Sequence, residues 1–403
     1  MPGRAHRRGD PARGGAAVSG FQPARRLRGI EKTAIREFFD RAPAGSINLG
    51  LGEPDLPTPD VVRQAAVRAI QDERNGYTTH AGLVALRERV AGEYPSLGAG
   101  PDRVIITAGS QEALYLALTT LVDDGDEVLL PDPGFVAYPT IVRMAGGRPV
   151  FYRLPAAGDF ELDLDDFRKK VSRRTKVVVC ISPSNPTGRA LTARDLEGMA
   201  RALEGSGALV VSDEIYRELY FGDARPPSIA DHYRGTVVMS GLSKSMSMTG
   251  WRLGWLCGPA EVVRSALVLH GYVTTCASTI SQKAALAAWT PEAGAAREAM
   301  RGTFRRRRDH LLELVGRTLG LRAVKPDGAF YTMVDVAPYG ASQRVAETLL
   351  EHRVITVPGA TFGSEAEGFL RLSFCAEEGA LTEGVRRIAA ALAQLKPRQE
   401  LPV

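Results

Sequence analysis

The sequence lacks long apolar runs and has few cysteines. No uninterrupted apolar stretch approaches the roughly 18 to 20 residues that a membrane-spanning helix needs, so we expect no transmembrane segment. The four cysteines (Cys180, Cys257, Cys276 and Cys375) are far apart and form no CxxC pair. This spacing argues against a disulfide framework and against a thiolate metal site, and it fits the reducing conditions of the cytoplasm.

Acidic residues are almost absent from the first 28 residues, which contain seven arginines and a single acid, Asp10. Subtracting this +6 from the net charge of +5 leaves −1 for the other 375 residues, which therefore carry no general basic surface for nucleic acid. We predict a disordered basic tail over residues 1–28, since Gly, Pro, Ala and Arg dominate it. An organelle transit peptide is the alternative, but it would be amphipathic and rich in serine, and residues 1–20 contain only Ser19.

From about residue 100, short apolar runs alternate with stretches of helical periodicity. Seven runs are rich in β-branched residues and bounded by turn residues: 103–107, 127–131, 148–152, 176–182, 208–213, 236–241 and 252–258. Runs that are apolar almost throughout are typical of strands buried on both faces. The sequence therefore predicts an α/β fold with a large domain over residues 75–290, in which helices flank a mostly parallel seven-stranded sheet.

The C-terminal part has a different pattern. A long helix is expected over residues 291–319, followed by strands near 329–336, 354–357 and 368–374, a helix from Ser342 and a final helix. This mixture predicts a smaller α+β domain over residues 291–403. We expect residues 29–74 to form an N-terminal segment that packs on this small domain.

Polar residues that end predicted strands are the first candidates for a site, because ligands of parallel sheets bind beyond the carboxyl ends of the strands. The stretch IITAGSQEAL runs from a strand straight into a helix and presents backbone N–H groups to an anion. Asp213 ends an apolar strand and needs a partner, which is either a cationic ligand or a salt bridge to a neighbouring helix. The stretch SPSNPTG after residue 181 is either a tight loop or part of the same site.

The stretch GLSKSMSMTGWRLGW contains two cations without an acidic neighbour in sequence. No Asp or Glu occurs from His232 to Ala260, so Lys244 and Arg252 are either solvated surface cations or are neutralised from elsewhere. A distant carboxylate or a phosphate would neutralise either cation. Schiff-base formation would remove the charge of the lysine. A lysine, a desolvated carboxylate, an amide, a phenol, an anion cup and an arginine are together what pyridoxal phosphate requires.

The ordered motifs GEPD, GSQEAL, NPTG, DEIY, SK with GWRLG, and RLSF resemble those of the class I/II aminotransferases, the pyridoxal-phosphate enzymes of fold type I. The similarity runs from about Gly29 to the C-terminal helix. It implies an aminotransferase that moves an amino group between an L-amino acid and a 2-oxo acid by a ping-pong mechanism, with pyridoxal 5′-phosphate as the cofactor and no metal.

The resemblance assigns roles around the cofactor ring. Lys244 matches the Schiff-base lysine, which later moves a proton as a free amine. Asp213 matches the partner of the ring nitrogen, and Asn185 and Tyr216 match the groups that hydrogen-bond the ring oxygen. Phe135 falls where an aromatic side chain stacks on the cofactor, and a core phenylalanine is the alternative.

The resemblance also implies a phosphate cup. It consists of Ser243, Arg252 and the backbone amides of Ser110 and Gln111, and the cofactor phosphate would supply the counter-charge that Arg252 lacks. Gly241 stands where many relatives have a serine, which implies a cup with one hydroxyl fewer.

Substrate contacts follow from the same resemblance. Arg371 matches the arginine that holds the α-carboxylate through a two-bond fork, and Gly52 and Asn185 complete that grip. Ile30 and Thr33 are placed near the substrate side chain.

Two further positions concern specificity and assembly. Some dicarboxylate-specific relatives have a lysine where Gln111 stands, so we expect no strict aspartate specificity unless a partner subunit supplies a cation. Tyr77 matches a tyrosine that reaches the phosphate of the neighbouring subunit, which implies a homodimer with shared sites.

Two other functions remain open. A carbon–sulfur β-lyase on the same scaffold would use the same catalytic residues. A non-catalytic pyridoxal-phosphate-binding regulator would need a fused DNA-binding domain, and we expect the 28 residues before the family-like region to be too few for one. The expected partners are small molecules and a second copy of the chain, without specific nucleic acid or membrane, in the cytoplasm.

Overall fold

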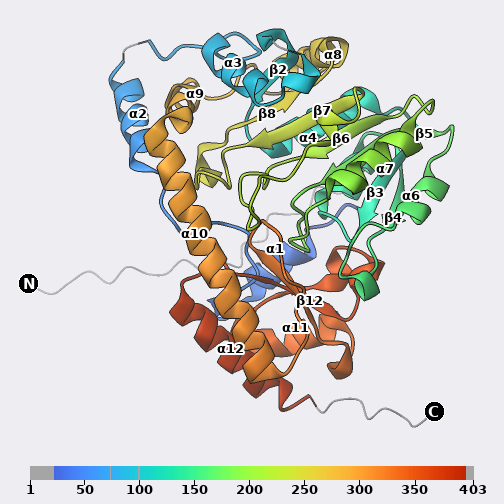
Figure 1. Ribbon diagram of the computed structural model, residues 1–403, viewed down its shortest axis with the longest axis vertical. Helices are drawn as coiled ribbons and strands as arrows, with labels where there is room; N and C mark the ends of the chain where they lie inside the picture. Colours follow the sequence, from blue (N-terminus) through green and yellow to red (C-terminus); the bar gives the residue numbers. More distant parts are fainter. Residues whose placement is uncertain (1–21, 73, 99, 396–403) are drawn as a thin grey trace, which may run out of the picture.

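A seven-stranded sheet forms the centre of the larger part of the molecule (Figure 1). Its strand order is β2-β8-β7-β6-β5-β3-β4, and every neighbouring pair is parallel except the two that involve β8. The strands are β2 Val104–Thr107, β3 Glu127–Asp132, β4 Arg148–Arg153, β5 Thr175–Ile181, β6 Leu209–Asp213, β7 Thr236–Gly241 and β8 Gly254–Cys257. Each coincides with one of the seven predicted runs, so the predicted α/β fold with a mostly parallel sheet is confirmed.

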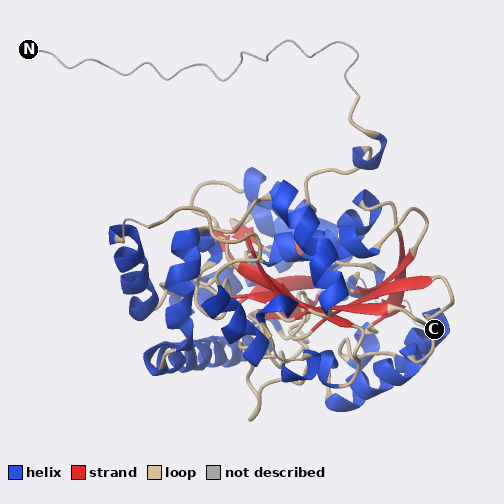
Figure 2. Ribbon diagram, turned by 90° about the horizontal axis from the view of Figure 1, so that it is seen from above, coloured by secondary structure: helices blue, strands red, loops and turns tan. Residues whose placement is uncertain are grey.

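Successive residues of the central strands bury against opposite layers of helices. In β5, Val177 and Val179 belong to a hydrophobic core that includes α4 (Ser110–Leu121) and α5 (Ala137–Met144). The intervening Val178 belongs to a second core with α6 (Leu164–Lys170) and α7 (Ala193–Leu203). Figure 2 shows helices on both faces of the strands. This two-sided burial explains why the strands are almost continuously apolar.

A third core covers the β2 end of the sheet. Here β2, β7 and β8 pack against three helices: α2 (Asp60–Gln71), α3 (Val84–Gly92) and α9 (Thr279–Ala285). Helix α8 (Ala260–Val273) lies on the other face, beside α4.

The C-terminal part contains a smaller sheet and three helices. Strands β11 (Val357–Pro358), β12 (Phe369–Ser373) and β9 (Tyr331–Asp335) form an antiparallel sheet in that order. It is accompanied by α11 (Ser342–Glu351) and α12 (Glu378–Leu392). The long helix α10 (Pro291–Leu314) continues as a π-helix over Val315–Leu319, and it extends from α2 and α9 at one end to α12 at the other (Figure 1).

The sequence explains where α10 begins and ends. The Thr290 side chain caps the helix by accepting the Ala293 N–H, Pro291 occupies the first turn, and Glu292 complements the helix dipole. Beyond the π-helix, Gly320 takes a left-handed conformation with φ 64°.

The N-terminal segment contacts both parts of the molecule. Strand β1 (Ile47–Asn48) pairs with β10 (Val354–Ile355), and α1 (Ala34–Arg41) lies nearby against β11. Helix α2, in contrast, packs on α9 of the larger part because Val62 and Ala66 join the core there. Strand β1 thus packs on the smaller part and α2 mainly on the larger part, so the packing of the whole segment on the small domain stays a prediction. The proposed domain limits at residues 75 and 291 remain our division of the chain.

The computed structural model describes residues 22–395 except 73 and 99. Most of the basic tail predicted over residues 1–28 therefore lies outside the described residues; within it, Arg25–Leu27 form a short 3-10 helix. None of the helices in this described part of the chain is long and apolar enough to cross a membrane.

Candidate active site

A cavity of about 280 Å³ opens at the carboxyl ends of β5, β6 and β7. It brings together eleven residues that the sequence singled out: Gly52, Ser110, Gln111, Phe135, Asn185, Asp213, Tyr216, Ser243, Lys244, Arg252 and Arg371. Seven further residues complete its lining: Ile35, Leu114, Ile181, Ile215, Met239, Thr249 and Tyr331. Side chains from distant parts of the chain therefore converge where a parallel sheet positions ligands.

Lys244 lies in this cavity without a carboxylate partner among the described residues. Its Nζ donates a hydrogen bond of 2.6 Å to the Gly52 carbonyl oxygen and lies 5.8 Å from the ring centroid of Phe330. Burial lowers the pKa of the Lys244 ammonium below its ordinary value. An amine shielded from water in this way is more readily neutral, and a neutral amine is a nucleophile and a base.

Asp213 ends β6 and is almost completely buried. Its carboxylate accepts hydrogen bonds from the Tyr138 hydroxyl at 2.8 Å and from the Ile215 N–H at 3.2 Å. Burial outweighs these bonds and raises the pKa of Asp213 to about 6. No salt bridge to a neighbouring helix is found for it within the described part of the chain, so a cationic ligand remains the partner that its position calls for.

Arg371, in the middle of β12, is also buried. Its Nη1 donates to Asn185 Oδ1 at 2.7 Å and its Nη2 donates to the Gly50 carbonyl at 2.5 Å, while Nε has no partner among the described residues. The guanidinium stacks over the ring of Tyr331, with Cζ 4.3 Å from its centroid. Burial lowers the pKa of Arg371, and these contacts fix the plane of a fork suited to a carboxylate.

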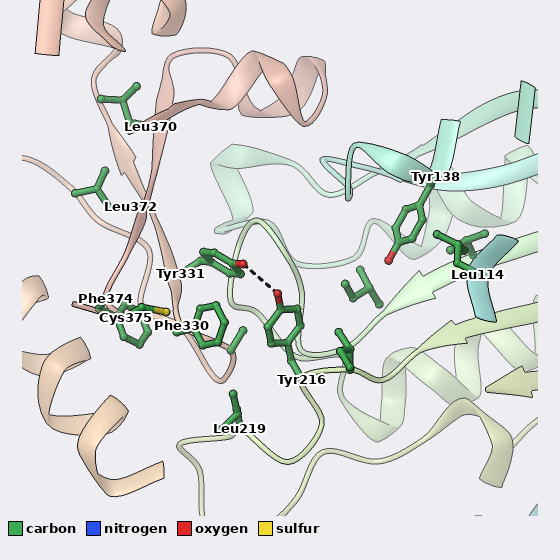
Figure 3. Close-up of a cluster of buried hydrophobic side chains, with 14 of the residues drawn as sticks. Leu114, Tyr138, Tyr216, Leu219, Phe330, Tyr331, Leu370, Leu372, Phe374 and Cys375 are labelled. Carbon is green, nitrogen blue, oxygen red and sulfur yellow. Dashed lines mark hydrogen bonds between the residues drawn. The ribbon is translucent and has the colours of Figure 1, made fainter. Parts of the chain in front are cut away.

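Two tyrosine hydroxyls join the larger and smaller parts across the cavity. Tyr216 follows β6 and Tyr331 begins β9, and their oxygens are 3.0 Å apart (Figure 3). The backbone of Gly52 lies so close that an added Cβ would be 1.6 Å from the Tyr331 oxygen. Only glycine fits at position 52, which explains why the second glycine of the stretch GLGEP (residues 50–54) is needed there.

The turn from β2 into α4 forms one wall of the cavity, as predicted. Gly109 has φ 91°, and a Cβ there would lie 2.5 Å from Nη2 of Arg252, so the guanidinium sits directly on this turn. Within the described part of the chain, Arg252 donates only to carbonyl oxygens, those of Thr249 at 2.9 Å and Ala108 at 3.4 Å. Because the first backbone N–H groups of a helix lack partners within it, the cation and this helix start form a binding place for an anion.

Three predicted residues do not line the cavity. Ile30 and Thr33 lie outside it, because the Thr33 hydroxyl caps α1 by accepting the Arg36 N–H and the helix that follows presents Ile35 instead. Ile35 lines the cavity, and the roles of Ile30 and Thr33 near the substrate stay predictions. Tyr77 is 88% exposed and does not reach the cavity of its own chain.

The sequence reasoning missed two residues at the site. Tyr138, three residues beyond Phe135, holds Asp213, and Tyr331 packs on Gly52 and Arg371. The signal available for both was a tyrosine within an apolar run, since the hydroxyl of a buried tyrosine needs a partner.

These features define an α/β protein whose cavity combines a partly buried amine, a buried carboxylate and two separated guanidinium groups. A family model for aminotransferases of class I and II matches residues 44–388. The probable aspartate/prephenate aminotransferase of Aquifex aeolicus is 38% identical over 362 residues, which cover 87% of this chain and 91% of that protein. The aromatic-amino-acid aminotransferase 2 of Thermococcus litoralis is 34% identical over 383 residues, or 92% of this chain and 98% of that protein.

Solved structures of aminotransferases also match this chain. A double mutant of the aspartate aminotransferase of Thermus thermophilus has a TM-score of 0.87 at 35% identity and covers 92% of this chain and 100% of its own. The chain belongs to the class I and II aminotransferase family and is a transaminase of fold type I. The predicted family resemblance is thereby confirmed.

Proposed function

We propose that this transaminase uses pyridoxal 5′-phosphate to move an amino group between an L-amino acid and a 2-oxo acid by a ping-pong mechanism. The observation that carries the proposal is that the partly buried amine of Lys244 and the buried carboxylate of Asp213 line one cavity, and that neither has a salt bridge among the described residues. Such a pair is unfavourable unless a ligand completes it.

The residues of the cavity fit this cofactor. The carboxylate of Asp213, whose pKa is raised by burial, suits a protonated ring nitrogen. Arg252 and the start of α4 suit the phosphate, and Lys244, which lines the same cavity, would be the amine for the aldehyde. Asn185 and Tyr216 would hydrogen-bond the ring oxygen, and Phe135 would stack on the ring. Ser243, Ser110 and Gln111 would complete the phosphate cup.

When bound, the cofactor supplies an aldehyde that condenses with amines and a ring that withdraws electrons from the substrate α-carbon. Arg371 holds the substrate α-carboxylate with its planar fork, and Asn185 keeps the guanidinium in that plane. Lys244 Nζ takes the proton from the α-carbon, since burial favours its neutral form. Asp213 remains anionic and keeps the ring nitrogen protonated. The stacked Tyr331 and the close backbone of Gly52 exclude water from this side.

The charges in the cavity bear on the substrate. Of the described residues that line it, three are cations, namely Lys244, Arg252 and Arg371, and each already has a role in the proposed mechanism. No cation is left for a second carboxylate, and Ile35 and Leu114 add apolar surface. This supports amino acids with uncharged side chains over strict aspartate specificity. A cation from a partner subunit is the alternative, and the relatives are named after both aspartate and aromatic amino acids.

We also propose that the protein is a homodimer in the cytoplasm. Exposed apolar side chains gather on α8, where Tyr272 is 90% exposed and Val268 is 65% exposed. The loop that carries the exposed Tyr77 lies beside α8, because a Cβ at Gly271 would be 2.9 Å from His80 Nδ1. An exposed apolar patch of this kind is typical of a protein interface. Tyr77 would then reach the phosphate site of the partner.

The test is a half-reaction. Purified protein loaded with pyridoxal phosphate is mixed with single amino acids and no 2-oxo acid, and the released product is counted per active site. A transaminase stops after about one 2-oxo acid per site, because the amino group stays on the enzyme. Continuous release of pyruvate and ammonia would instead establish the β-lyase alternative. Release of a 2-oxo acid from phenylalanine or leucine but not from aspartate would support the proposed substrate class. Release from aspartate alone would contradict it.

A further inference from the structure

Glu112 is a partly buried carboxylate next to the cavity for which the proposed mechanism has no use. It lies in the first turn of α4, and its two oxygens accept three hydrogen bonds. The donors are the Ala108 N–H, the Thr274 hydroxyl and His270 Nδ1, the last at 2.9 Å. His270 is completely buried in α8, and Thr274 directly follows that helix.

These bonds keep Glu112 ionised. Burial by itself raises the pKa of Glu112, but the hydrogen bonds from His270, Thr274 and Ala108 outweigh it, and the pKa lies below the ordinary value. A carboxylate with three donors is rigid as well as charged, because every bond must break before it can rotate.

The anchored residue, Ala108, belongs to the turn that bears the proposed phosphate cup. Its carbonyl accepts from Arg252, and the following Gly109 lies under the same guanidinium. The carbonyl of Gly109 accepts the N–H groups of Glu112 and Ala113. No acceptor for the N–H groups of Ser110 and Gln111 is found among the described residues. The carboxylate of Glu112 thus occupies the Ala108 N–H, the Thr107 carbonyl accepts the Gly109 N–H, and the N–H groups of Ser110 and Gln111 are left for an anion.

We propose that Glu112 is a positioning residue for the phosphate cup. With His270 and Thr274 it ties the turn between β2 and α4 to the end of α8, so that the free N–H groups and Arg252 face one anion in a fixed geometry. The inference rests on the proposed function, because it assumes that the anion is the cofactor phosphate. The same helix, α8, carries the exposed apolar patch of the proposed dimer face on its outer side.

The test compares cofactors with and without the phosphate. The apoprotein is titrated with pyridoxal 5′-phosphate, with pyridoxal and with inorganic phosphate, and the ratio of the first two affinities measures what the phosphate contributes. Glu112→Ala leaves buried donors unpaired, so we expect it to weaken binding of pyridoxal phosphate and of inorganic phosphate by about tenfold or more. Binding of pyridoxal is expected to change by less than about threefold.

Conservative variants separate positioning from folding. In Glu112→Gln the amide oxygen accepts the Ala108 N–H and the amide nitrogen donates to Thr274 and His270, so affinity is expected to stay within about threefold of the wild type. Thr274→Val removes one donor and is expected to lower phosphate affinity by an intermediate factor. Glu261→Ala, at an exposed position in the first turn of α8, is the matched control and should change nothing.

Two results would overturn the inference: an unchanged affinity of Glu112→Ala for pyridoxal phosphate, or an equal loss of pyridoxal and pyridoxal phosphate binding. If Glu112→Ala does not fold, Thr274→Val carries the test in the same way. Failure of the proposed function looks different, because the wild-type protein itself would then bind no pyridoxal phosphate.

Discussion

Replacing Asp213 by asparagine is expected to stabilise the protein without its cofactor at neutral and alkaline pH, although it should abolish catalysis. Burial raises the pKa of this carboxylate to about 6, so its ionised form is unfavourable until a cation arrives. Asparagine has the same shape: its oxygen can accept the Ile215 N–H, and its amide can donate to the Tyr138 oxygen.

The magnitude follows from the pKa. Below the ordinary value of 3.8 the carboxyl is protonated in the folded and the unfolded chain, so it contributes no pH dependence. Between 3.8 and about 6 the folded chain keeps a proton that the unfolded chain has released, so the free energy of unfolding falls as pH rises. Above about pH 6 the loss is complete, and at about 1.4 kcal/mol per pKa unit it amounts to about 3 kcal/mol. Asp213→Asn lacks this loss.

The assay is urea unfolding of the cofactor-free proteins at pH 4 and pH 8, at one protein concentration because association also adds stability. The variant should gain about 2 to 3 kcal/mol of unfolding free energy over the wild type between the two pH values. Asp223→Asn, at an exposed position, is the control and should show no such gain. The reasoning about Asp213 would be refuted if the unfolding free energies of variant and wild type differed by the same amount at both pH values. It would also be refuted if the variant were less stable than the wild type at pH 8.

Three further variants probe the neighbouring contacts. Tyr138→Phe removes a hydrogen bond that lowers the pKa of Asp213, so in unfolding measurements at intermediate pH values the upper end of the fall in stability should move up by about one pH unit from about pH 6; an unmoved upper end would contradict this. Gly52→Ala puts a methyl group against the Tyr331 oxygen and should lower kcat/KM by about 100-fold, with normal activity as the contrary result. Arg371→Lys loses the planar fork, so KM for the amino acid should rise by about 100-fold while the cofactor still binds, as steady-state kinetics and absorbance would report.

The sequence predicts the sheet well because each strand can be recognised from its own residues, without knowledge of its neighbours. Apolar runs bounded by turn residues define all seven strands, and the cap at Thr290 with Pro291 marks the start of α10. The direction of β8 could not be predicted, since a short buried strand has the same apolar pattern in either orientation.

The site could be predicted in part, because its polar residues end strands that meet at one edge of the sheet. Contacts between segments distant in sequence leave no such pattern. Tyr331 approaches Gly52 from a strand in the other part of the molecule, and Tyr138 reaches Asp213 from a neighbouring helix. Ile35 could not be singled out from the sequence, because the start of α1, set by the Thr33 cap, decides which residue of this segment lines the cavity.

The central claim is that Lys244 is the amine that binds the cofactor. The most direct measurement is reduction of the protein loaded with pyridoxal phosphate by sodium borohydride, followed by protease digestion and mass spectrometry of the peptides. We predict one pyridoxyl group per chain, on the peptide that contains Lys244, and none in Lys244→Ala. A label on another lysine, or no label in a protein that has been supplied with pyridoxal phosphate, would contradict the account.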